Sequence, residues 1–150
     1  MKPSVDVVIP VYNEERDLPK STVALHQFLT ENLENPWRIL IADNGSTDRT
    51  LSIAQMLTEK YPRVACIHLD QKGRGRALKK VWLESNADIV SYMDVDLSTD
   101  LHHFPALVGA IEEGFDIAIG SRLARGSKTR RSFKRELTSR TYNIMIKSLF

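Results

Sequence analysis

The sequence has a single cysteine and no long hydrophobic stretch. Cys66 lies in an apolar run, so no disulfide can form within the chain and an isolated buried thiol is expected. No segment approaches the ~20 apolar residues that a membrane-spanning helix needs, and the first residues lack the apolar region of a signal peptide. These absences predict a soluble domain in a reducing, cytoplasmic setting.

Glycine is absent from the loop "PVYNEER" that follows the first apolar run. A dinucleotide-binding fingerprint needs glycines there, because the backbone must come close to a pyrophosphate. The later stretch "KGRGRAL" lacks the third glycine of that fingerprint and follows a later strand. A nicotinamide cofactor is therefore not expected.

Acidic residues are scarce near the carboxyl end of the sequence. Residues 121–150 hold nine Lys and Arg and one acid, a net charge of +8, whereas residues 1–120 carry −6. An acidic body with a basic tail indicates a polyanionic partner near the tail. Base-stacking aromatic residues are not clustered there, so nucleic acid is not the expected partner.

Short apolar runs alternate with segments of helical periodicity along the first 120 residues. Leu18, Thr22, Leu25 and Leu29, for example, recur at helical spacing. The predicted strands are 5–10, 37–43, 64–69, 89–93 and 115–119. Their near-continuous apolar character predicts burial on both faces, and the alternation predicts an α/β fold with a mostly parallel sheet.

Polar residues stand where these predicted strands end. They are Tyr12 and Glu14, Asp43, Asp94 and Asp96, and Ser121 and Arg122. In open parallel sheets, ligands bind beyond the carboxyl ends of the strands. The sequence therefore predicts a site assembled from loops that are far apart along the chain.

The stretch "YMDVDLSTD" places Asp94 and Asp96 two residues apart at the end of a buried strand. Carboxylates so placed can hold Mg²⁺ or Mn²⁺ together with phosphate oxygens of a substrate. The alternative is a solvated turn whose acids cap the next helix, a role expected of Asp100. A phosphatase of the haloacid-dehalogenase type would need this motif after its first strand, whereas here it follows the fourth.

Asp43, in "IADNGSTD", is a candidate to accept hydrogen bonds from a base or ribose, and Asn44 and Gly45 are expected to form a turn. Either Lys72 or Arg74 is expected to face phosphate. The four histidines show no metal-ligand spacing and are interpreted as structural or exposed, and both tryptophans, Trp37 and Trp82, as core residues.

Five stretches together resemble glycosyltransferase family 2: "VVIPVYNEE", "ADNGSTDRT", "KGRGRAL", "YMDVDLS" and "AIGSR". Within the family the chain is most similar to polyprenyl-phosphate glycosyltransferases such as dolichyl-phosphate mannose or glucose synthases. The resemblance implies a GT-A fold, a Rossmann-like three-layer α/β/α arrangement. It also implies that residues 1–122 form a nucleotide-sugar-binding core, with a basic acceptor loop and the start of an interfacial helix over 123–150.

The resemblance also implies roles for particular residues. The implied nucleotide contacts are Pro10, Tyr12, Glu14, Asp43, Lys72 and Asp94; the metal ligands are Asp94 and Asp96; the catalytic residues are Asp94, Asp96 and Arg122; and the acceptor-phosphate contacts are Arg122, Arg125 and Arg131. Family members often carry Gln where this chain has Ser98, so the serine is not assigned as a metal ligand.

The implied activity is inverting transfer of mannose or glucose from a nucleoside-diphosphate sugar to a polyprenyl phosphate, with Mg²⁺ or Mn²⁺ as cofactor. The expected location is the cytoplasmic face of a membrane, contacted through the basic tail. GT-A domains of the family continue further, so the chain is expected to be truncated at its C-terminus. Two alternatives remain: a nucleotide-sugar-binding fragment without turnover, and a transferase with a saccharide hydroxyl as acceptor.

Overall fold

The computed structural model describes residues 1–120, and the chain divides into two units, 1–118 and 119–150. The elements are β1 (Val5–Val11), α1 (Leu18–Asn32), β2 (Trp37–Asp43), α2 (Thr50–Lys60), β3 (Val64–His68), α3 (Arg74–Glu84), β4 (Ile89–Tyr92), the 3₁₀ turn η1 (Leu101–His103) and α4 (Phe104–Glu112). The predicted residues Arg122, Arg125 and Arg131 and the predicted segment 123–150 lie outside the described residues.

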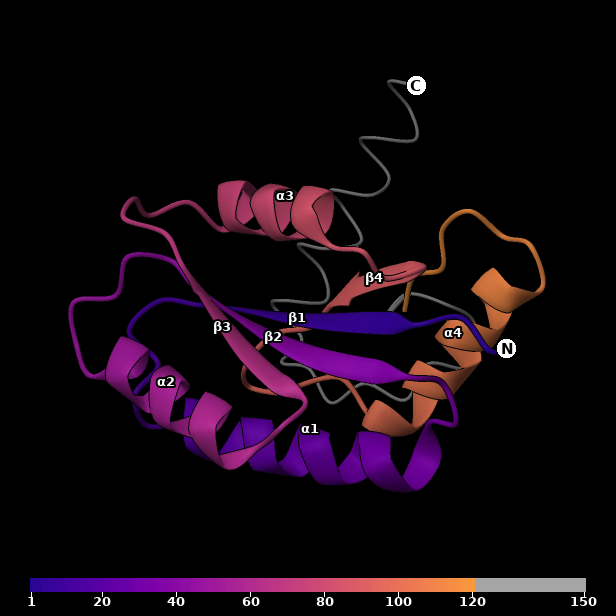
Figure 1. Ribbon diagram of the computed structural model, residues 1–150, viewed down its shortest axis with the longest axis horizontal. Coiled ribbons are helices and arrows are strands. Elements are labelled where there is room, and N and C mark those ends of the chain that lie inside the picture. Colours follow the sequence, from indigo (N-terminus) through magenta and orange to yellow (C-terminus); the bar gives the residue numbers. More distant parts are fainter. Residues whose placement is uncertain (121–150) are drawn as a thin grey trace, which may run out of the picture. The chain divides into compact units, whose positions relative to one another are not determined.

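The four strands form one parallel sheet in the order β3-β2-β1-β4. Val5 of β1 lies opposite Trp37 of β2 on one side and opposite Ile89 of β4 on the other. Figure 1 shows α1 and α2 on one face of the sheet and α3 on the opposite face. The predicted α/β fold with a parallel sheet between helical layers is confirmed.

The core has two parts because successive side chains of a strand point to opposite faces of the sheet. Val7 and Ile9 of β1 face α1, where they join Leu25 in one cluster of buried side chains. Val8, between them in the sequence, faces the other way and packs in a second cluster with Val81 of α3. β1 is thus covered on both faces, which explains its unbroken run of apolar residues.

The fifth predicted strand, 115–119, is not formed. This segment follows α4 as irregular chain, and Phe115 and Ile117 are 61% and 79% exposed. A strand needs a neighbouring strand to pair its backbone groups, and none of the described strands pairs with this segment. The apolar character of this segment was therefore a misleading guide, because it reports a side-chain preference and not the presence of a partner.

Two further predictions concern single side chains. Trp37 is buried as expected, but the prediction for Trp82 was wrong, since it is 37% exposed and donates from Nε1 to the carbonyl oxygen of Ser91 at 3.4 Å. Cys66 is a free, half-buried thiol. Burial, followed by the nearby charge of Asp43, raises the pKa of the Cys66 thiol to about 11, so it stays protonated at neutral pH.

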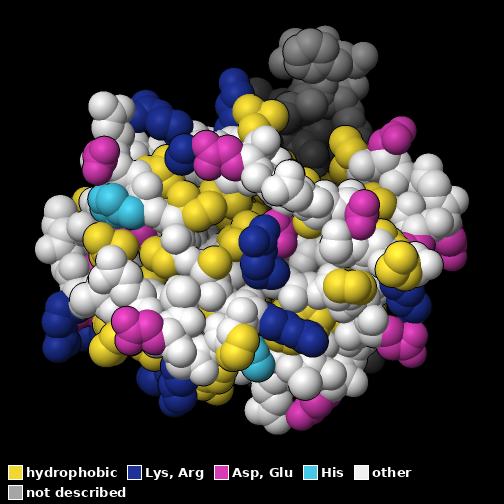
Figure 2. Space-filling view, viewed as in Figure 1, with side chains coloured by type: hydrophobic (Ala, Val, Ile, Leu, Met, Phe, Trp, Pro, Cys, Tyr) yellow, Lys and Arg dark blue, Asp and Glu magenta, His cyan; other side chains and the backbone are white. Residues whose placement is uncertain are grey.

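One face of the described part of the chain carries charges of both signs. Figure 2 shows Lys and Arg side chains interspersed with Asp and Glu over the face that it displays. Interspersed charges of both signs produce no strong field of one sign. This face therefore carries no basic patch of the kind that binds a polyanion.

A buried carboxylate fixes the amino-terminal half of β1. Asp6 is 3% exposed and accepts hydrogen bonds from Arg38 Nε at 3.1 Å, Arg38 Nη2 at 2.7 Å and Ser85 Oγ at 2.6 Å. Arg38 belongs to β2, and Ser85 follows α3. The carboxylate therefore connects three elements, and its charge is compensated only while Arg38 is present.

Replacing Arg38 with methionine should lower the free energy of unfolding by about 1–3 kcal/mol, because the buried Asp6 carboxylate would lose its counter-ion. Breaking a fully buried ion pair can cost about 3–5 kcal/mol. A loss that large is not expected here, since the Arg38 side chain is 48% exposed. Urea unfolding monitored by circular dichroism measures the change.

The matched control is Lys80→Met, which removes a cation from the exposed pair with Glu84. Such i,i+4 pairs contribute roughly 0.3–0.5 kcal/mol, so this variant should unfold almost as the wild type does. Equal losses in the two variants would show that Asp6 does not depend on its ion pair.

Candidate active site

The candidate site lies beyond the carboxyl ends of β1 and β4. The chain runs from β1 to β2 and β3 on one side and then places β4 on the other side of β1, which makes this the topological switch point of the sheet. An open pocket of about 400 Å³ is found there. It is lined by Pro10, Val11, Tyr12, Glu14, Asp17, Asn44, Arg74, Asp94, Val95 and Asp96.

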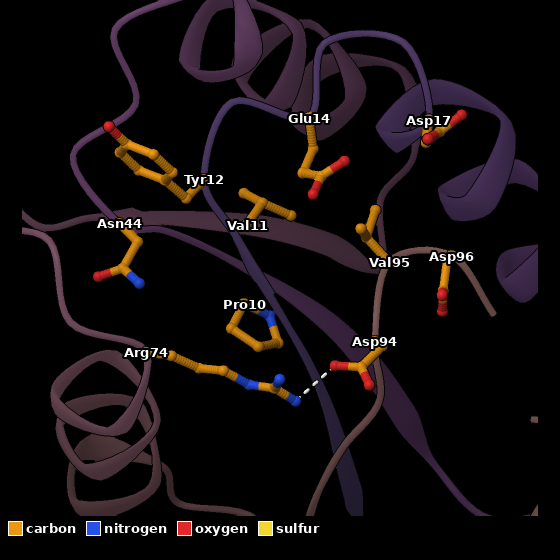
Figure 3. A pocket seen from close by; sticks show the side chains of 10 residues that line it. All are labelled: Pro10, Val11, Tyr12, Glu14, Asp17, Asn44, Arg74, Asp94, Val95 and Asp96. Atoms are coloured by element: carbon orange, nitrogen blue, oxygen red, sulfur yellow. Dashed lines mark hydrogen bonds and ion pairs between the residues drawn. The ribbon is translucent and has the colours of Figure 1, made fainter. Parts of the chain in front are cut away.

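The structure brings together most of the predicted nucleotide and metal residues. Figure 3 shows Arg74 and Asp94 on one side of the pocket, Glu14 and Asp17 on the other, and Asp96 beside Asp94. The four acidic side chains come from the loop after β1, the start of α1 and the loop after β4. The pocket is therefore strongly acidic, and an anionic ligand needs a compensating cation to enter it.

The loop after β1 is held by hydrogen bonds to the loop after β2, which explains why it needs no glycine. Asn13 has a positive φ of 56° and is among the residues that tolerate this conformation. Its Oδ1 accepts from the backbone N–H of Thr47 at 2.8 Å, and its own N–H donates to Ser46 Oγ at 3.0 Å. The N–H of Glu14 donates to Thr50 Oγ1 at 2.7 Å. These bonds fix the position of Glu14 at the pocket.

The loop after β4 presents Asp94 and Asp96 on either side of Val95, which is buried. Asp96 Oδ1 accepts a hydrogen bond from the N–H of Ser98 at 3.0 Å, and Leu97 between them has a φ of 45°. A leucine with positive φ is strained, and such strain is concentrated at functional sites. The predicted capping role of Asp100 is confirmed, since it accepts from the N–H of His102 at 3.0 Å.

Glu14 is the acidic group whose ionisation the pocket opposes. Burial raises the pKa of Glu14 above its usual value, and the nearby carboxylates of Asp17, Asp48 and Asp96 raise it further. An ionised Glu14 is therefore disfavoured by the folded protein itself. A bound cation would relieve this repulsion.

Asp43 does not line the pocket, which differs from the prediction that it contacts a base or ribose directly. Its side chain is completely buried, and Oδ2 lies 2.6 Å from Nδ1 of His68. Oδ1 is also buried and has no hydrogen-bond partner among the described residues. An unpaired buried oxygen is costly, so Oδ1 of Asp43 indicates a missing donor at the end of β2.

His68 was missed because a histidine was judged only by spacing to other metal ligands. A better signal was available, since Asp43 ends the predicted strand 37–43 and His68 lies one residue before the end of the predicted strand 64–69. In the parallel pairing of β2 with β3, Asp43 lies directly opposite His68. Side chains at paired positions lie on the same face of a sheet, so their contact follows from the pairing.

Asn44 and Gly45 form the predicted turn, and Asn44 has a second role. Gly45 has a φ of +71°, and an added Cβ would lie 3.2 Å from the carbonyl oxygen of Asp70, so glycine is required there. Oδ1 of Asn44 accepts from the N–H of Gly73 at 2.9 Å, which ties the start of α3 to the pocket. Lys72 lies outside the lining residues, with Nζ 3.8 Å from the ring centroid of Tyr12.

The donor atoms suit a divalent cation that is shared with a substrate. Among the described residues, no group of three or more His, Cys, Asp or Glu side chains could enclose a metal ion. Asp94 and Asp96 are nevertheless exposed carboxylates at the pocket. Two carboxylates, completed by phosphate oxygens and water, are an ordinary environment for Mg²⁺ and a suitable one for Mn²⁺.

An open parallel α/β sheet with a pocket at its switch point defines the class of doubly wound α/β folds, which bind their ligands at this edge. A family model described as "Glycosyl transferase family 2" matches residues 6–149. The chain therefore belongs to glycosyltransferase family 2.

Curated relatives support this placement. The chain is 36% identical over 137 residues to a dolichol-phosphate mannosyltransferase of Pyrococcus furiosus, covering 91% of this chain and 38% of that protein. It is 33% identical over 146 residues to the glycosyltransferase AglD of Haloferax volcanii, covering 95% and 23%. An undecaprenyl-phosphate 4-deoxy-4-formamido-L-arabinose transferase of Pectobacterium carotovorum is 32% identical over 151 residues, with 96% and 43% covered. The chain thus spans less than half the length of these relatives.

Solved structures agree on the fold. A mannosyltransferase from Pyrobaculum calidifontis, in complex with GDP-Man and Mn²⁺, matches with a TM-score of 0.55 at 22% identity, covering 64% of this chain and 28% of that one. Glucosyl-3-phosphoglycerate synthase from Mycobacterium tuberculosis matches with a TM-score of 0.53 at 28% identity, covering 75% and 40%. The fold is therefore the GT-A fold. Within residues 1–120, no helix has the length and apolar character needed to span a membrane.

Replacing Glu14 with glutamine should stabilise the protein at neutral pH. The raised pKa means that the folded state binds this proton more tightly than the unfolded state does. The stability of the wild type therefore falls as the pH rises from about 4.5 through the raised value, and the penalty is complete above it. Urea unfolding between pH 4 and pH 8 should show an advantage for Glu14→Gln that grows across this range.

The control for Glu14→Gln is Glu59→Gln, which removes the same charge from an exposed position of α2. This variant should follow the pH dependence of the wild type. An advantage for Glu14→Gln that is independent of pH would contradict the electrostatic explanation.

Replacing His68 with leucine should reduce the free energy of unfolding by about 1–3 kcal/mol, because both oxygens of the buried Asp43 would then lack a side-chain partner. The same substitution in an Asp43→Asn background should cost less, since an unpaired amide is cheaper to bury than a carboxylate. Equal costs in the two backgrounds, measured by urea unfolding, would argue against the Asp43–His68 interaction.

Proposed function

We propose that this chain is the donor-binding part of an inverting glycosyltransferase that moves a sugar from a nucleoside-diphosphate sugar to a polyprenyl phosphate. The observation that carries the proposal is the pocket in which Tyr12 and Glu14 meet Asp94 and Asp96. The relatives named for dolichol-phosphate and undecaprenyl-phosphate transfer support this acceptor class. Mannose and glucose remain the candidate sugars.

The residues of the pocket have distinct tasks under this proposal. Tyr12 and Glu14, with Pro10 beneath them, bind the nucleoside, and Lys72, beside the Tyr12 ring, supplies a positive charge for the phosphates. Asp43 precedes Asn44, which lines the pocket, and its buried contact with His68 fixes the backbone at this position. Asp94 and Asp96 would hold Mg²⁺ or Mn²⁺.

The reaction replaces one bond at the anomeric carbon of the sugar. An oxygen of the acceptor phosphate forms a bond to this carbon from the opposite side while the bond to the β-phosphate oxygen breaks. The nucleoside diphosphate leaves with the electron pair of that bond, and the divalent cation, when bound, neutralises the developing charge. A phosphate monoester is already an anionic nucleophile, so positioning is needed more than a general base.

The acceptor side of the proposal rests on residues outside the described range. Arg122, Arg125 and Arg131 would bind the acceptor phosphate, and the basic segment would contact an anionic membrane surface at its cytoplasmic face. Each basic residue near such a surface contributes about 1 kcal/mol. A saccharide hydroxyl acceptor is the alternative, and it would require a general base supplied elsewhere.

Titration calorimetry with GDP-mannose and UDP-glucose, with Mn²⁺ or with a chelator, tests the donor site. The wild-type chain should bind one of the two nucleotide sugars much more tightly in the presence of Mn²⁺ than in the presence of the chelator. Asp96→Asn should lose at least tenfold of this metal-dependent affinity, because the amide keeps the bond from Ser98 but not the charge.

Asp116→Asn is the matched control, since Asp116 is an exposed acid outside the pocket. Its affinity should equal that of the wild type. If neither nucleotide sugar binds to the wild type with Mn²⁺, the proposed function is wrong. If Asp96→Asn binds as the wild type does, Asp96 is not a metal ligand.

A further inference from the structure

Arg74 is placed to act on the candidate metal ligands, although the resemblance gives it no role. It is the first residue of α3, and its Nη2 donates to Oδ1 of Asp94 in the loop after β4. Figure 3 shows the guanidinium reaching across the side of the pocket to this carboxylate. Among the described residues that line the pocket, Arg74 is the one cation.

The base of the Arg74 side chain is fixed, whereas its end is free to move. The preceding residue, Gly73, is bound through its N–H to Asn44 at 2.9 Å, so α3 begins at a defined point beside the pocket. The guanidinium lies 5.4 Å from the ring centroid of Tyr92 and is not enclosed. Both Arg74 and Asp94 have side chains that are 53% exposed. Ion pairs of this exposure are weak and can open at little cost.

Asp94 cannot serve Arg74 and a divalent cation equally well at the same time. A cation at this carboxylate would lie close to the guanidinium, and like charges at such distances repel each other. Asp96 is differently engaged, since it accepts from a backbone N–H and has no basic partner among the described residues. The arriving metal ion therefore competes with Arg74 for Asp94 in particular.

A diphosphate changes the outcome of this competition. It brings negative oxygens into a pocket that already holds four carboxylates, and guanidinium groups bind phosphate oxygens in a forked, charge-assisted arrangement. A guanidinium released from Asp94 is already at the pocket wall and can turn to these oxygens. The loss of one partner is then compensated by the gain of another.

We propose that Arg74 is an exchangeable counter-ion: it neutralises Asp94 in the empty pocket and transfers to the diphosphate of the ligand when a divalent cation takes its place on Asp94. The proposal rests on the proposed function, because it assumes a nucleoside diphosphate as ligand. Beyond that function, it assigns to Arg74 the coupling between metal binding and diphosphate binding.

The consequence is cooperative binding of the two components. A cation alone must displace Arg74 without compensation and therefore binds weakly. A cation together with a diphosphate provides the guanidinium with a new partner and binds well. By thermodynamic linkage, the diphosphate strengthens cation binding by the same factor as the cation strengthens diphosphate binding. Arg74 thus prevents the acidic pocket from retaining metal ions when no donor is present.

Three variants separate this role from a structural one. Arg74→Met removes the charge and keeps a side chain of similar length, whereas Arg74→Lys keeps the charge without the fork. Arg76→Met is the matched control, because Arg76 lies on the same helix but donates to Gln71 and does not line the pocket. Circular dichroism melting curves establish that each variant is folded.

Two titrations are required for each protein. Electron paramagnetic resonance of free Mn²⁺ measures the affinity for the metal ion alone. Calorimetry with GDP and with UDP, in saturating Mn²⁺, measures the affinity for the diphosphate. Arg74→Met should bind Mn²⁺ alone roughly two- to fivefold more tightly, as expected when an exposed ion pair no longer competes, and the diphosphate about tenfold more weakly, as expected for loss of a charge-assisted contact.

Arg74→Lys should fall between Arg74→Met and the wild type in both titrations, and Arg76→Met should match the wild type. Opposite shifts for metal and diphosphate are the signature of the exchange, since damage to the pocket would weaken both. Unchanged Mn²⁺ affinity in Arg74→Met, or a fall in both affinities, overturns the proposal. If the wild type binds neither GDP nor UDP, the proposed function fails, and the Mn²⁺ titration alone decides whether Arg74 competes at Asp94.

Discussion

The position of β1 between β2 and β4 is the constraint on which the rest of the structure depends. Its backbone is paired on both sides, and its side chains are buried on both faces. Because the chain reaches β4 only after leaving β1 in the other direction, the loops after these two strands separate and leave room for a pocket. Asp6 strengthens this arrangement by connecting β1 to Arg38 and Ser85.

The pocket itself opposes stability in several ways. Glu14 is kept among other carboxylates that raise its pKa, Leu97 has a strained backbone, and Oδ1 of Asp43 is buried without a partner in the described part of the chain. The two hydrophobic clusters on either side of the sheet offset these costs. Unfavourable groups collected at one edge of a well-packed sheet are typical of a binding site.

Family membership and the geometry of the pocket are two independent indications of the same kind of site. Two of the relatives that match most of this chain are named for transfer to dolichol phosphate or undecaprenyl phosphate, yet the chain spans less than half of the length of each. What it contains is the acidic pocket that would bind a donor. In that pocket the carboxylate of Asp94 is paired with the guanidinium of Arg74 when no ligand is bound.

The sequence by itself determined the strands β1 to β4, the parallel sheet and the meeting of Tyr12, Glu14 and Asp94, because buried strands are unbroken apolar runs and their ends share one edge. Only the tertiary structure decided contacts that depend on a partner. It left 115–119 without a partner among the described strands, exposed Trp82 in part, buried Asp43 against His68 and brought Arg74 to Asp94. A residue type indicates what a side chain can bind, but its neighbours in space decide what it does bind.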